Sequence, residues 1–441
     1  MRRLGASQTS KPIFFIICSD AGRNIYTYKI IHLANWRNHT NLLTSNIYSN
    51  IIHLHNKIES RLEIHMFNPV FLIIIALILL TMIVLMAFYY NKLIIRFVSI
   101  FNHKSKADYS KRYINIFRLL SLCIAGCTIV VFNAVGMTLL HYFFICLALE
   151  IVNKIIILTT KNRELKVWSL IYKSTIISVI ITAIIIVYGY INIHNIIRTE
   201  YTVQADKLIN DYKIVLLTDI HFGTILDKSD IEKVCERISN ENADMIILGG
   251  DIVDEGTTAT EMEEVIKALS TLQNRDGIYY VNGNHDLQQY SSDKALSDEE
   301  YLGMIEENGI RYIEDEVVEI NDEITLIGRQ DYSYSGRTDI EQLMENADKN
   351  KYIICADHQP VEYSKASKAG VDLYLSGHTH AGQVFPVGYF IKILKTADLY
   401  YGIKEIGDMT GIVSSGMCGW GFPVRTQEHC EYVVIELESS R

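Results

Sequence analysis

Apolar residues form long uninterrupted runs in the first half of the chain and short runs in the second half. Val70–Tyr90 and Ser174–Ile193 carry no charged side chain. Leu119–Leu149 has no Asp, Glu, Lys or Arg and, extended to Thr160, is long enough for two spans. A helix needs about 20 mainly apolar residues to cross a bilayer. The pattern therefore predicts four transmembrane helices, with a tight turn between the second and third near Asn133–Gly136.

In the second half, short aliphatic runs alternate with amphipathic segments. Lys213–Thr218 and Met245–Leu248 are typical of buried parallel strands, because each is almost continuously apolar and then stops abruptly. Asp227–Asn240 and Thr260–Leu272 have the spacing of helices. This alternation predicts an α/β domain whose functional side chains gather at one rim of a sheet.

These patterns divide the chain into four segments. Residues 66–195 form the membrane unit, residues 196–212 a linker, and residues 213–441 the α/β domain. Residues 1–65 are polar and contain no apolar run long enough for a span or a signal sequence. Because Met66 stands directly before the first long apolar run, we expect translation to start there, with residues 1–65 either untranslated or a disordered tail.

Charge is distributed as unevenly as hydropathy. Residues 1–200 contain 21 Lys and Arg against 7 Asp and Glu, whereas residues 201–441 contain 20 against 44, so their net charges are +14 and −24. Such asymmetry is typical of a basic membrane-associated half joined to an acidic half exposed to water. An acidic domain lacks the basic surface that nucleic acid requires, so the expected partner is the lipid bilayer and not nucleic acid.

Basic residues also orient the membrane unit, because short basic loops stay in the cytoplasm. The turn between the second and third spans carries no charge, whereas the other two connections are basic. Both ends of the unit should then face outward, which predicts an extracytoplasmic α/β domain. The basic residues of the two connections are Lys92, Arg96, Lys104, Lys106, Lys111, Arg112, Arg118, Lys161, Arg163, Lys166 and Lys173.

Few ionisable groups lie within the predicted spans. Glu150 and Lys154 stand four residues apart on one helical face, which predicts a paired or snorkelling couple near the cytoplasmic end. His141 lies in the same span, but no second charged span continues a pathway, which disfavours a transporter. Among the eight cysteines, only Cys418 and Cys430 are placed for a bridge, and their spacing alone does not establish one.

Metal-type ligands follow the predicted strands of the second half. Asp219 and His221 come directly after Lys213–Thr218, and residues i and i+2 of an extended chain point to the same side, so both can reach one ion. Asp251 follows Met245–Leu248 after two glycines; taken alone, it could be a turn residue or a helix cap. A carboxylate combined with imidazole suits Mn, Fe, Zn or Co better than Ca.

Three further motifs repeat this arrangement after short apolar runs. They are Gly283-Asn284-His285-Asp286, the single His358, and Gly377-His378-Thr379-His380. Residues 201–441 contain six histidines, of which five lie in these motifs and one, His429, lies outside. This distribution disfavours a purely structural role for the set.

The five motifs in this order resemble those of the calcineurin-like metallophosphoesterase superfamily. The Gly-His-Thr-His-Ala-Gly-Gln form, together with a membrane-anchored amino-terminal half, resembles its bacterial membrane-associated branch. The resemblance covers about residues 211–437 and does not include the membrane unit. It implies a four-layer αββα sandwich with a two-metal site, and hence a metal-dependent phosphoric ester hydrolase.

The resemblance also implies a role for each motif residue. A pair of Mn, Fe, Zn or Co ions shares a hydroxide that attacks the phosphorus of a phosphomonoester or phosphodiester. His285 stabilises the transition state or protonates the leaving oxygen, and Asp286 orients its imidazole. The implied ligands are Asp219, His221 and His380 for one ion, Asn284, His358 and His378 for the other, and Asp251 as the bridge.

Two alternatives to an enzyme stay open: a non-catalytic metal-binding scaffold and a membrane sensor module. The intact ligand set disfavours the first, and the scarcity of ionisable residues in the spans disfavours the second. A short linker keeps the site near the bilayer, which favours a lipid-linked or cell-envelope phosphoester over a free nucleotide. Ser291–Glu300 and Arg329–Arg337 either shape specificity or are solvated connections.

Overall fold

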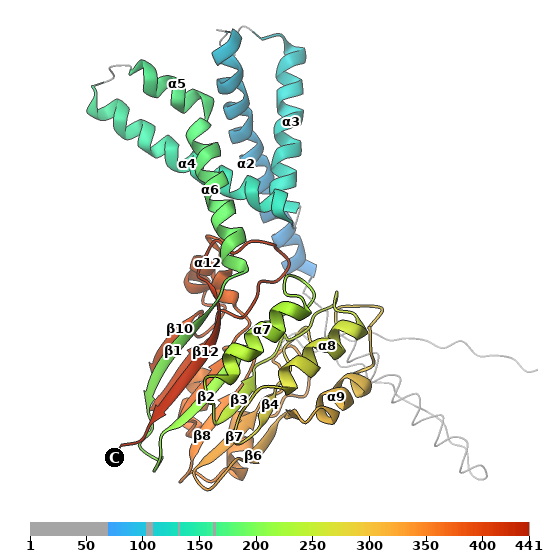
Figure 1. Cartoon of the computed structure of the whole chain (residues 1–441). Coiled ribbons are helices and arrows are strands. Elements are labelled where there is room, and N and C mark those ends of the chain that lie inside the picture. Colours follow the sequence, from blue (N-terminus) through green and yellow to red (C-terminus); the bar gives the residue numbers. More distant parts are fainter. Residues whose placement is uncertain (1–68, 103–108, 131–132, 162–164, 441) are drawn as a thin grey trace, which may run out of the picture. The chain divides into compact units, whose positions relative to one another are not determined.

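The computed structural model describes residues 69–102, 109–130, 133–161 and 165–440. The predicted segment 1–65 and the predicted start at Met66 lie outside these residues. Four helices long and apolar enough to cross a membrane precede the α/β domain, as predicted (Figure 1). The predicted turn is also present, because Asn133 caps the third of them by accepting hydrogen bonds from two backbone N–H groups. The four helices are α2 (Pro69–Asn102), α3 (Lys111–Val130), α4 (Ala134–Thr159) and α6 (Ile176–Ile193).

Glu150 on α4 is held by a neighbouring helix and not by Lys154. Its carboxylate accepts a hydrogen bond from Arg96 at 2.8 Å and one from Lys92 at 2.9 Å, both on α2. Tyr172, on the short helix α5 (Lys166–Ser174), donates a third at 2.7 Å. Among the described residues, no ion pair joins Glu150 to Lys154, which is exposed. The cations that neutralise Glu150 therefore reach it across a helix interface, which spacing along a single helix cannot reveal.

The α/β domain contains two six-stranded sheets, which we call the first and second sheet. The first has the strand order β1 (Ile196–Gln204), β12 (Cys430–Glu438), β2 (Tyr212–Leu217), β3 (Met245–Leu248), β4 (Ile278–Tyr280) and β5 (Arg311–Tyr312). The second has the order β10 (Gly402–Ile406), β11 (Met409–Val413), β9 (Leu373–Ser376), β8 (Tyr352–Ala356), β7 (Ile324–Gly328) and β6 (Glu316–Glu319). In both sheets the central pairs run parallel, as the buried strand pattern predicts.

Alternating side chains of each strand pack on opposite faces, which produces four layers. In β2, Val215 and Leu217 join the core under the outer helices, whereas Ile214 and Leu216 join the core between the sheets. The helices α7 (Lys228–Ser239), α8 (Ala259–Ser270) and α9 (Asp298–Glu307) cover the first sheet (Figure 1). The second sheet is covered by α10 (Ile340–Leu343), η2 (Met344–Asn346) and α11 (Tyr363–Ala369). The predicted αββα sandwich is confirmed.

The three outer helices of the first sheet begin where the sequence provides a capping box. Asp227, Thr258 and Ser297 each accept a hydrogen bond from the backbone three residues later, and an acidic side chain at that position bonds back. Such reciprocal caps satisfy N–H groups that the first turn of a helix leaves without partners. They fix the starts of α7 and α8 close to the predicted positions.

The predicted linker is largely a strand of the first sheet. β1 begins at Ile196, three residues after α6 ends at Ile193, and pairs in parallel with β12 along its whole length. Its exposed and buried residues alternate, which is the pattern of a strand with one covered face. Because its apolar positions are interrupted by Arg198, Thr199 and Glu200, the segment differs from the continuous aliphatic runs of the central strands. The membrane unit is consequently joined to the sheet directly.

Candidate metal centre

The motif residues lie at the carboxyl ends of strands from both sheets. Asp219 and His221 follow β2, Asp251 follows β3, and Asn284 follows β4. His358 follows β8, and His378 with His380 follows β9, the latter within the short turn η3 (His380–Gly382). Parallel strands end at the same rim, so side chains far apart in the sequence converge there. All seven predicted ligands are at least half-buried.

Asp219, His221 and His380 form the first group of potential ligands. One ligand atom from each lies within 4.8 Å of the other two. The Nε2 atoms of His221 and His380 are 3.2 Å apart, and Nε2 of His380 is 3.5 Å from a carboxylate oxygen of Asp219. The structure thus brings together the three residues that the sequence assigns to one ion.

Asp251, His358 and His378 form the second group, with the same 4.8 Å limit between ligand atoms. Nε2 of His358 lies 3.1 Å from Oδ2 of Asp251 and 3.3 Å from Nδ1 of His378. Oδ2 of Asp251 is also 3.7 Å from Nε2 of His221, so this one carboxylate faces both groups. That position is the one a bridging ligand requires.

Asn284 has a buried side-chain oxygen that accepts no hydrogen bond from any described residue. A buried amide oxygen without a donor is unfavourable unless another electrophile satisfies it. A divalent cation would do so, because amide oxygen is an accepted ligand for such ions. The chemistry of this orphan atom fits the ligand role that the sequence assigns to Asn284.

The environment favours neutral, metal-binding imidazoles at three of the four predicted ligand histidines, since burial lowers the pKa of His380 as it does those of His221 and His378. Burial lowers the pKa of His221 to about 3 and that of His378 to about 4. A neutral ring keeps a lone pair for a cation. Burial also disfavours a charge on His358, but the carboxylates of Asp251 and Asp219 outweigh burial and raise its pKa well above the ordinary value. The imbalance of negative charge around His358 is what a bound cation would neutralise.

Backbone carbonyls fix which ring nitrogen of two ligands faces the centre. Nδ1 of His358 lies 2.9 Å from the carbonyl oxygen of Gly249, and Nδ1 of His380 lies 3.2 Å from that of Cys418. In both rings Nε2 is therefore left to face the other ligands. Such outer contacts set the tautomer and the ring orientation of metal-binding histidines.

The backbone at the centre is strained. Asp219, His221, Asp251, His378 and His380 all have positive φ angles, between 42° and 69°. Side chains other than glycine rarely adopt this region, and such residues cluster at functional sites, where the surrounding structure holds them. The strain results from chain turns that deliver consecutive ligands to one point.

The motif predicts that Asp286 contacts the imidazole of His285, but in the structure Asp286 binds backbone N–H groups instead. Its carboxylate accepts hydrogen bonds from the backbone N–H groups of Asp251, Ile252, Val253 and Gly283, at 2.6–3.1 Å. Burial, with the nearby charge of Asp251, raises the pKa of Asp286 to about 6. The side chain consequently fastens the turn that carries Asp251, and the expected orientation of His285 by Asp286 has to be corrected.

The residue that holds His285 is Glu255, which sequence reasoning missed. Oε2 of Glu255 lies 2.6 Å from Nδ1 of His285, while the backbone N–H of His285 donates to Asp251 at 2.9 Å. Burial disfavours the imidazolium, but the hydrogen bond and charge of Glu255 outweigh it and raise the pKa of His285. Tyr290 and Trp420 flank the ring at 5.4 and 5.2 Å between centroids. Only the position of Glu255 next to Asp254 in the Gly-Asp-x-x-Asp motif could have indicated it.

Arg425 is a second residue without a predicted role at the centre. Its fully buried guanidinium donates to the carbonyl oxygens of His380, Ser415, Cys418 and His429 at 2.7–3.1 Å. Four carbonyls from three stretches of the chain are thereby tied together next to the predicted ligand His380. Cys418 and Cys430, whose spacing left a bridge open, are both free cysteines in the structure.

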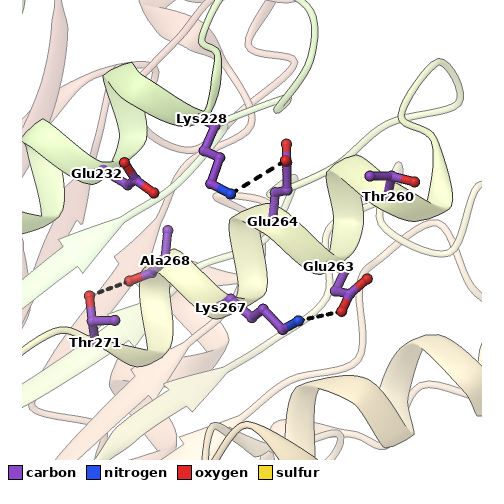
Figure 2. A pocket seen from close by; sticks show the side chains of 8 residues that line it. All are labelled: Lys228, Glu232, Thr260, Glu263, Glu264, Lys267, Ala268 and Thr271. Carbon is purple, nitrogen blue, oxygen red and sulfur yellow. Dashed lines mark hydrogen bonds and ion pairs between the residues drawn. The ribbon is translucent and has the colours of Figure 1, made fainter.

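A separate hollow on the outside of the domain does not include any of these residues. It has a volume of about 480 Å³ and lies between α7 and α8, where Lys228 approaches Glu264 at 3.6 Å and Lys267 pairs with Glu263 (Figure 2). These ion pairs are exposed to solvent, and such pairs contribute little. The hollow is a charged surface groove between two helices and offers no converging ligands.

A four-layer sandwich with two Asp/His groups at its strand ends defines a metallophosphoesterase type of centre. Residues 212–382 match the family model described as calcineurin-like phosphoesterase, and the chain therefore carries a domain of that family. Four helices that are long and apolar enough to cross a membrane precede this domain.

Similar proteins come from bacteria and animals. An uncharacterized metallophosphoesterase of Helicobacter pylori is 32% identical over 54% of this chain and 63% of its own length. An uncharacterized metallophosphoesterase of Campylobacter jejuni is 27% identical over 68% of this chain and 79% of its own length. A transmembrane protein with metallophosphoesterase domain from Danio rerio is 26% identical over 70% and 73%. This chain thus spans less than two thirds of the Helicobacter relative.

Proposed function

We propose that this chain is a membrane-anchored phosphoester hydrolase that works with two divalent cations. The observation that supports this most strongly is the position of Asp251, which faces both Asp/His groups. In this proposal, Asp219, His221 and His380 hold one cation, Asn284, His358 and His378 hold the other, and Asp251 touches both. Bound there, the cations would supply Lewis-acid activation of water and of the phosphoryl oxygens.

The chain's own groups prepare the reaction around that centre. Asp286 and Arg425 fix the turns that carry Asp251 and His380, so the ligands are held in place before substrate arrives. The hydrogen bond between Glu255 and Nδ1 of His285 leaves Nε2 of the ring available to the substrate. We assign His285 the task of holding a proton at Nε2 beside the oxygen that leaves phosphorus.

The proposed substrate is a lipid-linked or cell-envelope phosphoester on the outer side of the membrane. Support comes from the connection between the two parts of the chain, since only His194 and Asn195 separate the end of α6 from the start of β1. In addition, Nε2 of His141 in α4 lies 2.8 Å from Oγ1 of Thr426, next to Arg425. The centre is therefore attached closely to residues of the membrane helices, which favours a substrate that is itself held at the bilayer.

The test is metal content and turnover of the purified full chain. We expect the protein, reconstituted with Mn²⁺, to bind two ions and to hydrolyse bis-p-nitrophenyl phosphate. His358→Ala and Asp251→Asn should lose metal and turnover together. His429→Ala is the matched control, because His429 is the one histidine of the domain outside the motifs and should keep both. Full turnover of Asp251→Asn, or a protein that takes up no divalent ion, would contradict the proposal.

Substrate class requires a separate comparison. The same protein should hydrolyse a phospholipid-like ester in vesicles faster than a nucleotide or a sugar nucleotide at equal concentration. A preference for the free nucleotide would reject the lipid-linked part of the proposal and leave the hydrolase part intact.

A further inference from the structure

The short helix α12 (Val387–Leu394) exposes almost all of its apolar side chains. Tyr389, Phe390, Ile393 and Leu394 are 52–72% exposed, and only Gly388 is buried. The outer helix α7 differs in this respect, because it faces water on one side and buries all its apolar residues. These are Ile231, Val234, Cys235 and Ile238. A cluster of exposed aromatic and aliphatic residues on one helix marks a surface that contacts something apolar.

The segment that leads into α12 contacts the membrane helices. The ring of Phe385 lies 6.3 Å from that of Phe144 in α4, and Val384 joins an apolar cluster with Met137 of α4 and Ile186 of α6. At 1.5 Å per residue, Phe144 lies about 15 Å along α4 from its first residue. α12 thus starts beside residues that lie within two of the spans.

The charges of α12 suit a lipid surface. Lys392 and Lys395 are exposed, and neither takes part in an ion pair among the described residues. They are positive charges on a domain half that carries a net charge of −24. Lysines that flank an apolar helix face can extend toward anionic lipid headgroups while their stems stay on the apolar side.

We propose that α12, with Phe385, is an in-plane membrane helix that inserts its apolar side chains into the bilayer crossed by the four spans. The occupant of this face is lipid, because the face continues directly from the lipid-exposed spans and no described residue covers it. Phe390, Ile393 and Leu394 enter the acyl boundary, and the two lysines stay at headgroup level.

The helix is also rigidly connected to the metal centre. A Cβ at Gly382, two residues after His380, would overlap the backbone of Gly388, and a Cβ at Gly388 would overlap Gln427. Oε1 of Gln383 accepts a hydrogen bond from the backbone N–H of Trp420, whose ring flanks His285. If the proposed function holds, insertion of α12 places the centre at headgroup level, where a lipid phosphoester is presented.

The test is photocrosslinking of the full chain in vesicles of phosphatidylcholine and phosphatidylglycerol. p-Benzoylphenylalanine replaces Ile393, and in a matched variant it replaces Ile209. Ile209 is likewise an exposed isoleucine of the domain, but it lies beyond the end of β1 that is remote from α6. We expect lipid adducts, identified by mass spectrometry, at position 393 and none at 209. A crosslinked dimer at position 393, or equal lipid adducts at both positions, would overturn the proposal.

A second variant tests the presentation of the centre to lipid separately from catalysis. Ile393→Asp changes an exposed residue outside the metal centre, so turnover of soluble bis-p-nitrophenyl phosphate should be unchanged. Hydrolysis of a vesicle-borne phospholipid ester should fall at least several-fold. If the vesicle rate of Ile393→Asp equals that of the unchanged protein, α12 does not present the centre to lipid, whatever the activity on the soluble ester.

Discussion

Asp251 is positioned by a residue that has no side chain at all. A Cβ on Gly283 would overlap Oδ1 of Asp251 and lie 2.5 Å from its backbone nitrogen. The same turn is closed from the other side by the Asp286 carboxylate. The geometry of the carboxylate that faces both ligand groups therefore depends on neighbours that bind no metal themselves.

Gly283→Ala is accordingly expected to damage the centre without changing any ligand. The displaced Asp251 should reduce metal binding and turnover on the order of 10- to 100-fold, the scale typical of changes in the support of metal ligands. Elemental analysis and hydrolysis of the aryl phosphodiester measure both. Gly303→Ala is the control, since a Cβ there meets nothing within 4 Å, and Ala in the α9 helix should stabilise the domain by about 0.5–1 kcal/mol. Unchanged metal content in Gly283→Ala would contradict this account.

Glu255→Gln should separate catalysis from metal binding. The substitution removes the charge that holds Nδ1 of His285 but touches none of the seven ligands. We expect turnover to fall on the order of 10-fold with bound metal unchanged, because an outer hydrogen bond orients the imidazole. Glu299→Gln, an exposed residue of α9, serves as the control. Loss of metal from Glu255→Gln would show that Glu255 supports the ligands and not His285.

At the scale of elements, the sequence predicts best what depends on hydropathy alone. The four spans, the central strands and the helices α7 and α8 were all predictable, because continuous or periodic apolar residues decide each of them. The convergence of the motif residues was predictable for a related reason, since parallel strands deliver their ends to one rim. The strand β1 was not predictable, because its partner β12 lies more than two hundred residues later and its alternation of exposed and covered residues is short.

Two other features could not be predicted because they depend on contacts between distant segments. Arg425 becomes important only when three stretches of the chain place four carbonyls around it. The segment of α12 has eight residues, mostly apolar but including Lys392, and this length fits a strand as well as an interfacial helix. Its exposure appears only in three dimensions.

Helix association in the membrane unit should depend on Glu150. Its carboxylate accepts from Arg96, Lys92 and Tyr172, which come from two other helices. Glu150→Gln leaves the partly buried Arg96 without its counter-charge, so the melting temperature in detergent should fall. Removing one partner of a buried pair costs about 3–5 kcal/mol, and partial exposure of this pair makes the loss smaller. Lys154→Gln should leave the melting temperature unchanged; an equal drop in both variants would indicate a general charge effect.

For the whole molecule, charge and contacts together support one orientation in the membrane. The uncharged turn before α4 and the end of α6 both approach the α/β domain, through Met137 and Asn192. The basic connections belong to the opposite ends of the helices. The α/β domain therefore lies at the same end of the helices as the uncharged turn. The distribution of lysine and arginine favours this arrangement.

We predict that the α/β domain is extracytoplasmic. Alkaline phosphatase fused after Arg441 should be active, because it requires export, and a green fluorescent protein at the same position should be dark. Fusions within the basic connection after α2 should give the reverse pattern. A fluorescent carboxyl-terminal fusion together with an inactive phosphatase fusion would place the domain in the cytoplasm.

The strand order also has a consequence for biosynthesis. β12 lies between β1 and β2, so β1 cannot join the first sheet until the ribosome has synthesised residues 430–438. The spans leave the ribosome long before that point and can integrate while the domain is still an open chain. β1 therefore reaches its partner strand only after all four spans have been made. A chain truncated before Cys430 would leave β1 unpaired. The unpaired strand would then be accessible to quality-control proteases.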